Sequence, residues 1–506
     1  MHTIAESFRH GLGAEDYDVI GAPWLETCQN MRPALGGLRP YRPVTQPFTC
    51  AISWPKPQVY RGRTTTWAFD GSNIYTLNES TWVKTGQDVA DYSTGNAIIG
   101  FTFGGGHVHV MDAGDIAIFF DGTKMVMYRE GWTGIKYRQL ASPVVKTGCV
   151  SNGRGVWANF DGWPAAWEVI WNALITKDTF EDSLSTNCVA WGVPGGGDWR
   201  FWFDPTLAQQ GSHYTAAPGD VHGAADPLFL EFWRRNQIGF MPMPWRDEIL
   251  RVMPIGNDNV VVYSENNVGA LVPFTSPAEG ARVYGYRHLS SIGTPQRSTI
   301  DGDDQSHVFV DSVGELRVIN ADLSMEVLGY KKHISPLLTD DVCVSFDPSR
   351  REAWISDEDA CYVLGKHGLS SASQRVTSMV PIGDDLVGCA EFRGVTPDVT
   401  AQVKTEVMDL GSRSVKTIKT VSLGMHTAAL TTVDVTVCYR RNATSAWKTM
   451  ASVNPNPEGQ VFCDVSGVEF QILVAADNYA AFMLDRIDLT YEVGGRLNLK
   501  TSMELA

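Results

Sequence analysis

The sequence predicts an all-β protein, a β-propeller of six or seven blades followed by a C-terminal β-sandwich. A short unit recurs along the chain, in which an apolar run, a turn dipeptide and a second apolar run follow one another. Glycine (48 residues) and proline (25 residues) are frequent, as expected of a turn-rich β protein. The last part of the chain alternates apolar and polar residues at period two, the pattern of half-buried strands.

The recurring unit is a predicted β-hairpin. Four copies can be followed, with their turns at Asp70-Gly71, Asp121-Gly122, Asn266-Asn267 and Val313-Gly314. Asp-Gly favours a two-residue type I′ turn, because both central residues of that turn need positive φ. Many hairpins in one chain of 506 residues are typical of a propeller or a large barrel.

Composition shifts along the chain predict its domains. Residues 1–45 have little periodicity and end in a Pro- and Gly-rich stretch, which predicts an extended N-terminal arm. Strand patterns at 46–395 predict the propeller, interrupted by a long Trp-rich excursion at about 192–247. An excursion of this length is unusual and often functional. Residues 396–506 predict the β-sandwich, a normal size for a domain.

Charge and apolar patterning exclude several classes of protein. The net charge is −16 and no basic run is longer than a pair, which argues against a general nucleic-acid-binding surface. The excess of acidic residues favours solubility; alternatively, it forms a surface that repels DNA, so that DNA passes it without binding. No apolar run approaches the roughly 20 residues of a membrane span, and the polar N-terminus predicts no secretory signal. Nine scattered cysteines predict reduced thiols and synthesis in the cytoplasm.

Three clusters of titratable residues are candidate metal sites. His107 and His109 fall on one side of a predicted strand and can share a metal, although packed or solvent-facing histidines are the favoured interpretation. Asp301–Asp304 resembles half of a calcium loop but lacks its later glycine and glutamate, so an acidic turn is favoured. Asp357–Asp359 is also interpreted as a solvated turn. We therefore expect no metal and no cofactor.

Nine of the 16 tryptophans lie between residues 157 and 245. Five of them are candidates for a subunit interface or a glycan contact: Trp191, Trp199, Trp202, Trp233 and Trp245. Indole rings stack on sugars but also fill cores and interfaces, and the second interpretation is favoured. No Gly-x-Ser-x-Gly elbow, phosphate-binding loop or sialidase-type aspartate box occurs, so we expect no catalytic residues and no enzyme.

A series of short segments occurs in a characteristic order. The segments are Cys28–Arg32 with Gly36–Pro40, Trp167–Asn172 with Lys177–Phe180, Pro242–Trp245 with Glu248–Arg251, Val260–Asn266, and Ile292–Ser298. This order resembles the β-propeller tail nozzle or hub proteins of short-tailed, podovirus-like bacteriophages, in patches over residues 28–330. The sequence departs from that pattern at Asn267-Val268-Gly269 and in the excursion, where the family has no counterpart.

The resemblance implies a structural virion protein, made in the host cytoplasm and located in the tail. It implies a homo-oligomeric ring, commonly a hexamer, at the distal end of the tail around the DNA exit channel, with roles in tail assembly and genome ejection. The implied partners are further copies of the chain, an adaptor and fibres, and viral DNA that passes without specific binding. The alternative is a glycan-binding or glycan-cleaving propeller that uses the Trp-rich region.

Overall fold

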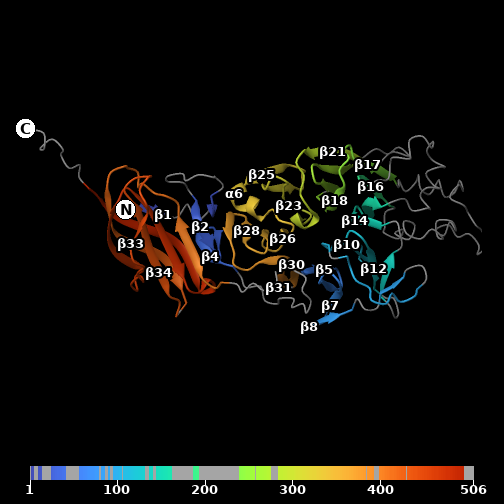
Figure 1. The fold of residues 1–506 in the computed structure, drawn as a ribbon, viewed down its shortest axis with the longest axis horizontal. Helices are drawn as coiled ribbons and strands as arrows, with labels where there is room; N and C mark the ends of the chain where they lie inside the picture. Colours follow the sequence, from blue (N-terminus) through green and yellow to red (C-terminus); the bar gives the residue numbers. More distant parts are fainter. Residues whose placement is uncertain are drawn as a thin grey trace, which may run out of the picture.

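A computed structural model describes most of the chain. The described residues are 2–4, 10–13, 24–41, 56–78, 81–85, 89–91, 95–104, 106–114, 116–130, 136–140, 144–161, 186–192, 239–256, 258–274, 283–382, 385–391, 398–428 and 430–494. Two parts follow one another along the long axis of the molecule (Figure 1), a propeller and a β-sandwich that occupies one end. The predicted fold class is therefore confirmed.

Among the described residues, the propeller consists of seven groups of strands around a central channel. Blade 1 contains β5 (Gln58–Arg61), β6 (Thr66–Phe69), β7 (Ile74–Asn78) and β8 (Thr81–Lys84). Blade 2 contains β10 (His109–Asp112), β11 (Ile116–Phe120), β12 (Met125–Arg129), β13 (Tyr137–Leu140) and β9 (Val89–Asp91). Blade 3 contains β14 (Val144–Ser151), β15 (Arg154–Asp161), β16 (Cys188–Trp191) and β17 (Gly239–Pro242).

The remaining blades follow in chain order. Blade 4 contains β18 (Ile249–Ile255), β19 (Asn259–Ser264), β20 (Val268–Pro273) and β21 (Tyr284–Ser290). Blade 5 contains β22 (Ile300–Gly302), β23 (Ser306–Val310), β24 (Leu316–Asn320) and β25 (Met325–Gly329). Blade 6 contains β26 (Cys343–Asp347), β27 (Glu352–Ser356), β28 (Cys361–Gly365) and β29 (Gly368–Ser371), and blade 7 contains β30 (Val376–Ile382) and β31 (Asp385–Glu391). Short helices lie between them at η3 (Arg297–Thr299), α6 (Lys331–Ile334) and η4 (Ser335–Leu337).

Blade 7 closes the ring. Its inner strand β30 lies between β26 of blade 6 and β5 of blade 1. The Ser378 hydroxyl donates to the Val59 carbonyl at 2.8 Å, and the Thr377 hydroxyl donates to the carbonyl of Pro57. Side-chain hydrogen bonds therefore join the end of the propeller to its beginning.

Each of the first six blades carries a buried aromatic ring on its second strand. These rings are Trp67, Phe119, Trp157, Tyr263, Phe309 and Trp354, each at most 2% exposed. Rings of neighbouring blades meet edge-on, as Trp67 and Phe119 do with centroids 5.2 Å apart, and as Tyr263 and Phe309 do at 5.4 Å. Edge-to-face contacts of this kind add to the apolar burial that holds the blades together.

The predicted hairpins are confirmed, but the type I′ turns predicted at Asp-Gly are wrong. The loop between β6 and β7 has four residues and only its glycine, Gly71, has positive φ (+81°). The aspartate carboxylate instead accepts backbone N–H groups of the turn. The same arrangement recurs in blades 2, 5 and 6, with N···O distances of 2.6–3.0 Å at Asp70, Asp121, Asp311 and Asp357. All four aspartates are buried, because a short polar side chain satisfies the backbone within each tight turn.

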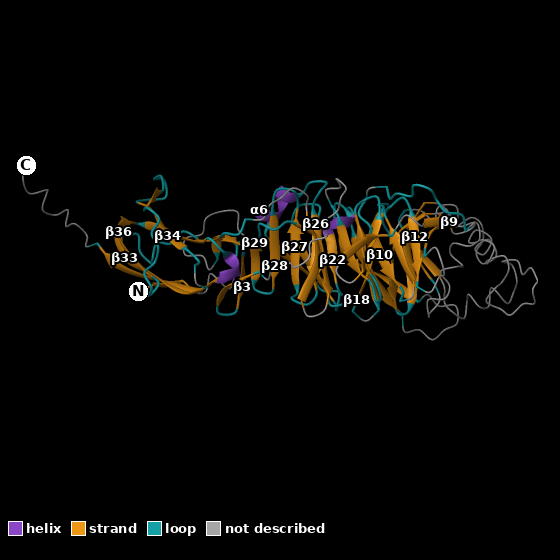
Figure 2. Ribbon diagram, turned by 90° about the horizontal axis from the view of Figure 1, so that it is seen from below, coloured by secondary structure: helices purple, strands orange, loops and turns teal. Residues whose placement is uncertain are grey.

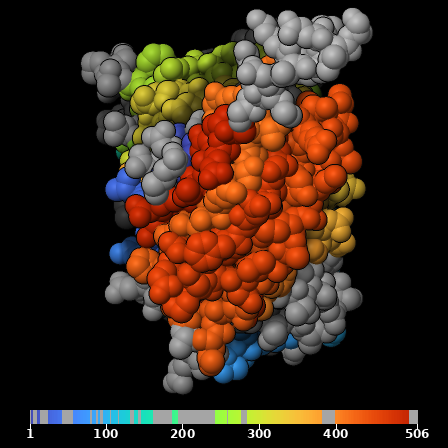
Figure 3. All heavy atoms as spheres, turned by 90° about the vertical axis from the view of Figure 1, so that its left-hand side faces the viewer, coloured from blue at the N-terminus to red at the C-terminus, as the bar shows by residue number. Residues whose placement is uncertain are grey.

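The C-terminal part is a sandwich of two sheets with a shared apolar core. One sheet contains β33 (Lys416–Thr427), β36 (Gln460–Gly467) and β38 (Phe482–Val493). The other contains β32 (Ala401–Thr405), β34 (Val433–Arg440), β35 (Lys448–Thr449) and β37 (Glu469–Ala476), and η5 (Tyr479–Ala481) precedes β38. In Figure 3 the sandwich, in orange and red, forms most of the surface at this end of the molecule.

The N-terminal stretch, expected as an extended arm, adds strands to this sandwich. These strands are β1 (His2–Ile4), β2 (Leu25–Gln29), β3 (Met31–Ala34) and β4 (Gly37–Pro40). β1 and β4 pair with β38, while β2 pairs with β32 on one side and with β29 of blade 6 on the other. The N-terminal strands therefore form part of the C-terminal sandwich. Hydrophobic periodicity within a segment does not predict such a pairing between distant segments.

Propeller and sandwich share one continuous sheet. Its order is β26-β27-β28-β29-β2-β32-β37-β34-β35, so blade 6 runs through β2 into the sandwich. Figure 2 shows β26, β27, β28 and β29, the blade 6 part of this sheet, side by side along the molecule. Asn30 reinforces the junction: its amide donates to the carbonyls of Asp398 and Thr400, and its carbonyl oxygen accepts from the Ser373 N–H at 2.7 Å. One apolar cluster also extends from blades 5 and 6 into the sandwich.

Candidate functional site in the central channel

The inner strands of the blades enclose a cavity of about 520 Å³ on the propeller axis. Its lining comes from β5, β10, β18, β22, β26 and β30, and therefore from residues that are far apart in the sequence. A second cavity of about 490 Å³ lies beside it. Gln58 and His107 line both cavities, so this pair stands between them.

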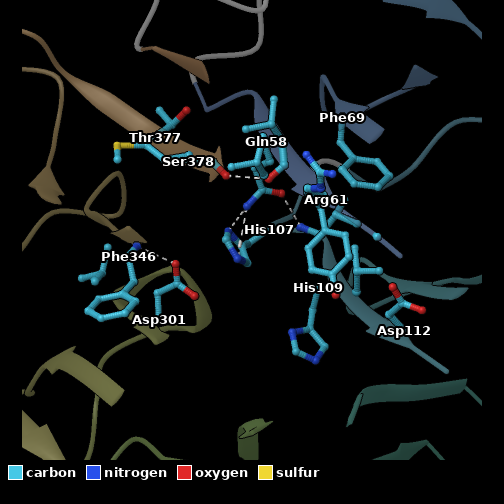
Figure 4. Close-up of a pocket in the computed structure, with 18 of the residues that line it drawn as sticks. Gln58, Arg61, Phe69, His107, His109, Asp112, Asp301, Phe346, Thr377 and Ser378 are labelled. Atoms are coloured by element: carbon cyan, nitrogen blue, oxygen red, sulfur yellow. Dashed lines mark hydrogen bonds between the residues drawn. The ribbon is translucent and has the colours of Figure 1, made fainter. Parts of the chain in front are cut away.

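Gln58 and His107 form the centre of the site. Figure 4 shows the Gln58 amide directed at the imidazole of His107. The Gln58 carbonyl oxygen accepts the backbone N–H of Val108 at 2.7 Å, which leaves its NH₂ group as the donor toward the ring. A ring nitrogen that accepts must be unprotonated. Burial lowers the pKa of His107 well below its usual value, and the nearby Arg251 acts in the same direction, so the imidazole is neutral.

His109 points to a different neighbour. Its Nε2 lies 2.7 Å from the Gly148 carbonyl oxygen on β14, so Nε2 carries the proton and Nδ1 is the acceptor. His109 is 6% exposed, and burial lowers its pKa to about 3. Its buried Nδ1 has no hydrogen-bond partner among the described residues. The two histidines of the predicted pair thus contact different blades.

Arg251 and Asp301 place opposite charges in the channel. One Arg251 Nη atom donates to the Ile300 carbonyl, and the other lies 3.7 Å from an Asp301 carboxylate oxygen. The second Asp301 oxygen accepts the Phe346 N–H at 2.8 Å (Figure 4). Burial raises the pKa of Asp301 while Arg251 opposes that shift. The Arg251 Nε is buried and has no partner in the described part of the chain.

The second cavity is bordered by another arginine, Arg297. Asp121 and Gly122, from the turn between β11 and β12, line the same cavity. The Arg297 guanidinium lies so close to Gly122 that a Cβ atom there would be 2.6 Å from one Nη. Burial lowers the pKa of Arg297, while Glu248 and Asp121 oppose the shift. Glycine at position 122 is favoured by its φ of +92°, and a side chain there would also have to displace the Arg297 guanidinium.

The candidate metal residues take other roles. No group of three or more His, Cys, Asp or Glu side chains is placed to hold a metal among the described residues. Asp301 belongs to the channel, whereas Asp303 caps the β22–β23 turn by accepting the Gln305 and Ser306 N–H groups and pairs with Arg351 at 2.9 Å. Asp357 likewise caps a turn and is buried rather than solvated.

Two of the five candidate tryptophans lie in the core. Trp191 is 1% exposed and meets Tyr284 edge-on, and Trp245 is 9% exposed and meets Tyr286. Their rings fill blades 3 and 4, which is the core alternative left open above. Trp199, Trp202 and Trp233 lie outside the described residues, as does most of the excursion at 192–247. Near the end of the excursion, β17 is described and completes blade 3.

Sequence reasoning missed most of the channel residues. It considered His107 and Asp301 as candidate metal ligands, favoured other interpretations for both, and gave no role to Gln58, Arg251 or Arg297. Their convergence depends on strands of different blades. One signal was available, because Arg251 follows Ile249 and Leu250 in an apolar inner strand, where an arginine is rarely buried without a partner.

No family model matches the sequence, and neither does any curated protein. Among solved structures, the PorZ component of the type-IX secretion system of Porphyromonas gingivalis is 10% identical, with a TM-score of 0.33 over 70% of this chain and 36% of that one. The extracellular domain of the putative one component system BT4673 from B. thetaiotaomicron is 7% identical, with a TM-score of 0.36 over 89% and 58%.

A third similar structure, YCF48 bound to D1 peptide, is 9% identical, with a TM-score of 0.34 over 69% of this chain and 96% of that one. The chain spans well under two thirds of the length of the PorZ and BT4673 structures. Within the described residues, no helix has the length and apolar character that a membrane crossing needs. The assignment as a propeller with a sandwich rests on the sheets described above.

Proposed function

We propose that this chain is a structural virion protein, the nozzle or hub of a short phage tail. Copies of the chain form a ring, a hexamer by the resemblance given above, around the DNA exit channel. The ring holds the adaptor and the fibres and guides the genome during ejection. The ordered series of segments that resembles the tail nozzle family supports this proposal.

The shared nine-stranded sheet is the structural observation that carries the proposal. Backbone hydrogen bonds across β29, β2 and β32 restrict movement of the propeller relative to the sandwich. A ring subunit needs this stiffness, because small rotations within each copy would open the ring. A propeller suits repeated packing, since its short strand edges are protected from uncontrolled sheet pairing.

The propeller's own channel is not the path of the DNA in this proposal. The channel cavity holds about 520 Å³ and is interrupted by Gln58 and His107. A duplex, whose major groove alone is about 12 Å wide, does not fit there. DNA therefore passes between copies, along the axis of the ring. The net charge of −16 suits such a wall, because like charges repel the phosphates and prevent sticking.

The sandwich offers a contact between copies. β36 is the last strand of its sheet in the described residues, and Phe462 on this strand is 71% exposed. An edge strand has unpaired backbone groups that can pair with another chain, so we assign Phe462 on this edge to a contact. We place β36 against a neighbouring copy.

The mass of the purified protein in solution, combined with cryo-electron microscopy of particles that carry it, tests the proposal. Rings, or density for the chain at the distal end of a tail, are the expected result. Phe462→Ser should weaken ring formation, whereas Phe274→Ser, which removes a 59% exposed ring from the propeller, should leave it intact. A monomer that is absent from particles would contradict the proposal and favour the glycan-binding alternative.

A further inference from the structure

The sandwich has an open strand edge at β36. In the described residues β36 is the last strand of its sheet, and it pairs with β33 on one side only. Lysine, proline and β-bulges commonly protect such an edge from pairing with another chain. The eight residues of β36 contain no lysine or proline, and the described pairing has one register shift, at Ile418 and Thr420 of β33. The outer side of β36 can therefore accept one more strand.

The surroundings of this edge are apolar and acidic. On the exposed face of β36, Phe462 is 71% exposed and the side chain of Asp464 is 77% exposed, although Asp464 pairs with Lys419 at 2.7 Å. β34 of the other sheet lies next to β36, and Val453, which pairs with Val435 of β34, is 39% exposed. A strand that is apolar on its inner face and basic on its outer face would fit this edge.

The segment that follows β38 has the sequence of such a strand. Between residues 496 and 505, the odd positions carry Leu497, Leu499, Thr501, Met503 and Leu505. The even positions are all polar and include Arg496 and Lys500. Alternation at period two is typical of a strand with one buried face. Residues 495–506 lie outside the described residues, so this pattern comes from the sequence alone.

The short connection after β38 favours pairing with a neighbouring copy rather than with the same copy. The Gly494 N–H donates to the Val415 carbonyl at 2.9 Å, so the chain stays beside the start of β33 up to this residue. A strand added beyond β36 lies three strand spacings from β38, about 14 Å. The two residues from Gly494 to residue 496 span at most about 7 Å. A return to the same copy would therefore consume several residues of the segment.

We propose that residues 496–505 of one copy add a strand to the open edge of β36 in a neighbouring copy. The apolar row faces the sandwich core and the polar row faces outward. Main-chain hydrogen bonds supply the affinity, as they do when a peptide adds a strand to an open sheet edge. The inference rests on the contact between copies proposed above, and it names the part of the neighbour that makes this contact.

Charge supports this orientation of the segment. Arg496 and Lys500 then lie on the same face as Phe462 and Asp464, where their alkyl stems can cover the aromatic ring and their charges meet the carboxylate. Residues 454–467 contain two acidic residues and no basic one. The segment and the edge are therefore complementary in charge as well as in apolar pattern.

Analytical ultracentrifugation of full-length variants tests the proposal. Leu499→Gln with Met503→Gln makes the apolar row polar, and Asn498→Gln with Ser502→Gln places the same residue twice in the polar row as the matched control. The first variant should associate at least about a hundredfold more weakly than the parent, because each contact loses two buried apolar side chains. The control should keep the mass of the parent, and far-UV circular dichroism should be the same for all three proteins.

Binding of the segment as a peptide gives an independent measurement. A fluorescein-labelled peptide of residues 496–506 should bind the full-length Leu499→Gln/Met503→Gln variant in fluorescence anisotropy, because β36 is open there. The peptide with both glutamine substitutions should bind at least about tenfold more weakly. Adding Phe462→Ser to the protein should also weaken binding of the parent peptide. In excess, the parent peptide should break the ring of the parent protein into smaller species.

The outcomes separate this inference from the proposed ring. A ring that persists in Leu499→Gln/Met503→Gln, or that is lost equally in the control, would overturn the strand addition and leave the ring intact. Peptide binding that is unaffected by Phe462→Ser would overturn the assignment to β36. No peptide binding together with loss of the ring in Phe462→Ser would overturn the inference and assign the edge to another part of the neighbour. A monomeric parent protein would overturn the proposed ring as well.

Discussion

Asp311, in the turn between β23 and β24, holds a buried arginine and the turn backbone at the same time. One carboxylate oxygen accepts the N–H groups of Val313 at 3.0 Å and Glu315 at 2.8 Å. The other accepts from Nε of Arg317 at 2.6 Å, and both side chains are buried. Asp311→Ala would therefore remove three hydrogen bonds and leave a buried cation without its partner.

The expected loss is large. Removing one partner of a buried ion pair costs about 3–5 kcal/mol of the free energy of unfolding, because the remaining charge stays desolvated. Asp311→Asn keeps one oxygen as acceptor but loses the charge, so it should fall between the parent and Asp311→Ala. Adding Arg317→Met to Asp311→Ala should recover part of the loss, since the unpaired charge is then gone.

Guanidinium unfolding followed by circular dichroism gives the free energies, and hydrogen exchange of amides in β23 and β24 localises the effect. Asp322→Ala is the matched control, because Asp322 accepts the Ser324 N–H at 2.8 Å in the next turn of the same blade but is exposed. It should cause a much smaller loss. Equal losses in Asp311→Ala and Asp322→Ala would refute the argument that burial and the arginine make the difference.

Three further predictions concern other parts of the molecule. Burial lowers the pKa of His307 to about 4, whereas the pKa of a histidine in the unfolded chain is near 6.5. The contribution of neutral His307 to the free energy of unfolding is therefore complete above pH 6.5 and is lost as the pH falls toward 4. His307→Gln should reduce the pH dependence of unfolding by roughly 3 kcal/mol across that window, whereas replacing the exposed His288 should not. Asn30→Ala removes three hydrogen bonds at the junction between propeller and sandwich, and it should lower the free energy of unfolding by about 2–3 kcal/mol. The calorimetric unfolding transition should also split in two, and a single unchanged transition would contradict the coupling of the two parts. Gly122→Ala should lower the melting temperature more than Gly100→Ala. Both glycines have positive φ, but only a Cβ atom at position 122 would contact the Arg297 guanidinium. Equal melting temperatures of the two variants would contradict this.

The fold was predictable from the sequence where neighbouring residues decide the structure. Asp70-Gly71 and Asp121-Gly122 mark hairpins because an aspartate followed by a glycine stops one strand and starts the next, whatever the exact turn. The turn geometry itself was not predictable, since it depends on the aspartate carboxylate, which is buried and accepts the backbone N–H groups of its own turn. The alternation of apolar and polar residues also predicted the sandwich strands, because one face of each sheet is buried and the other is exposed to solvent.

The channel and the domain junction were not predictable, because they depend on residues distant in sequence. Arg251 meets Asp301 only when blades 4 and 5 lie side by side. His107 and His109 follow the two-residue spacing of a metal pair, yet β10 begins only at His109, so the alternation of a strand does not extend to both. Gln58, which fixes the orientation of His107, lies 49 residues before it in the sequence, with the rest of blade 1 and β9 between them.

The placement of the N-terminal strands connects folding with the proposed assembly. β1 and β4 pair with β38, the last strand among the described residues, so the sandwich is complete only after β38 has been synthesised. β2 joins the other sheet of the sandwich, through β32, to blade 6 through Gln29 and Ser371. Before β2 pairs with them, the edges of β29 and β32 are open, which favours pairing with other chains. If β36 is the contact between copies, as proposed, the contact surface becomes competent only when the sandwich is complete. The order of the strands in the chain therefore favours complete folding of each copy before it enters a ring.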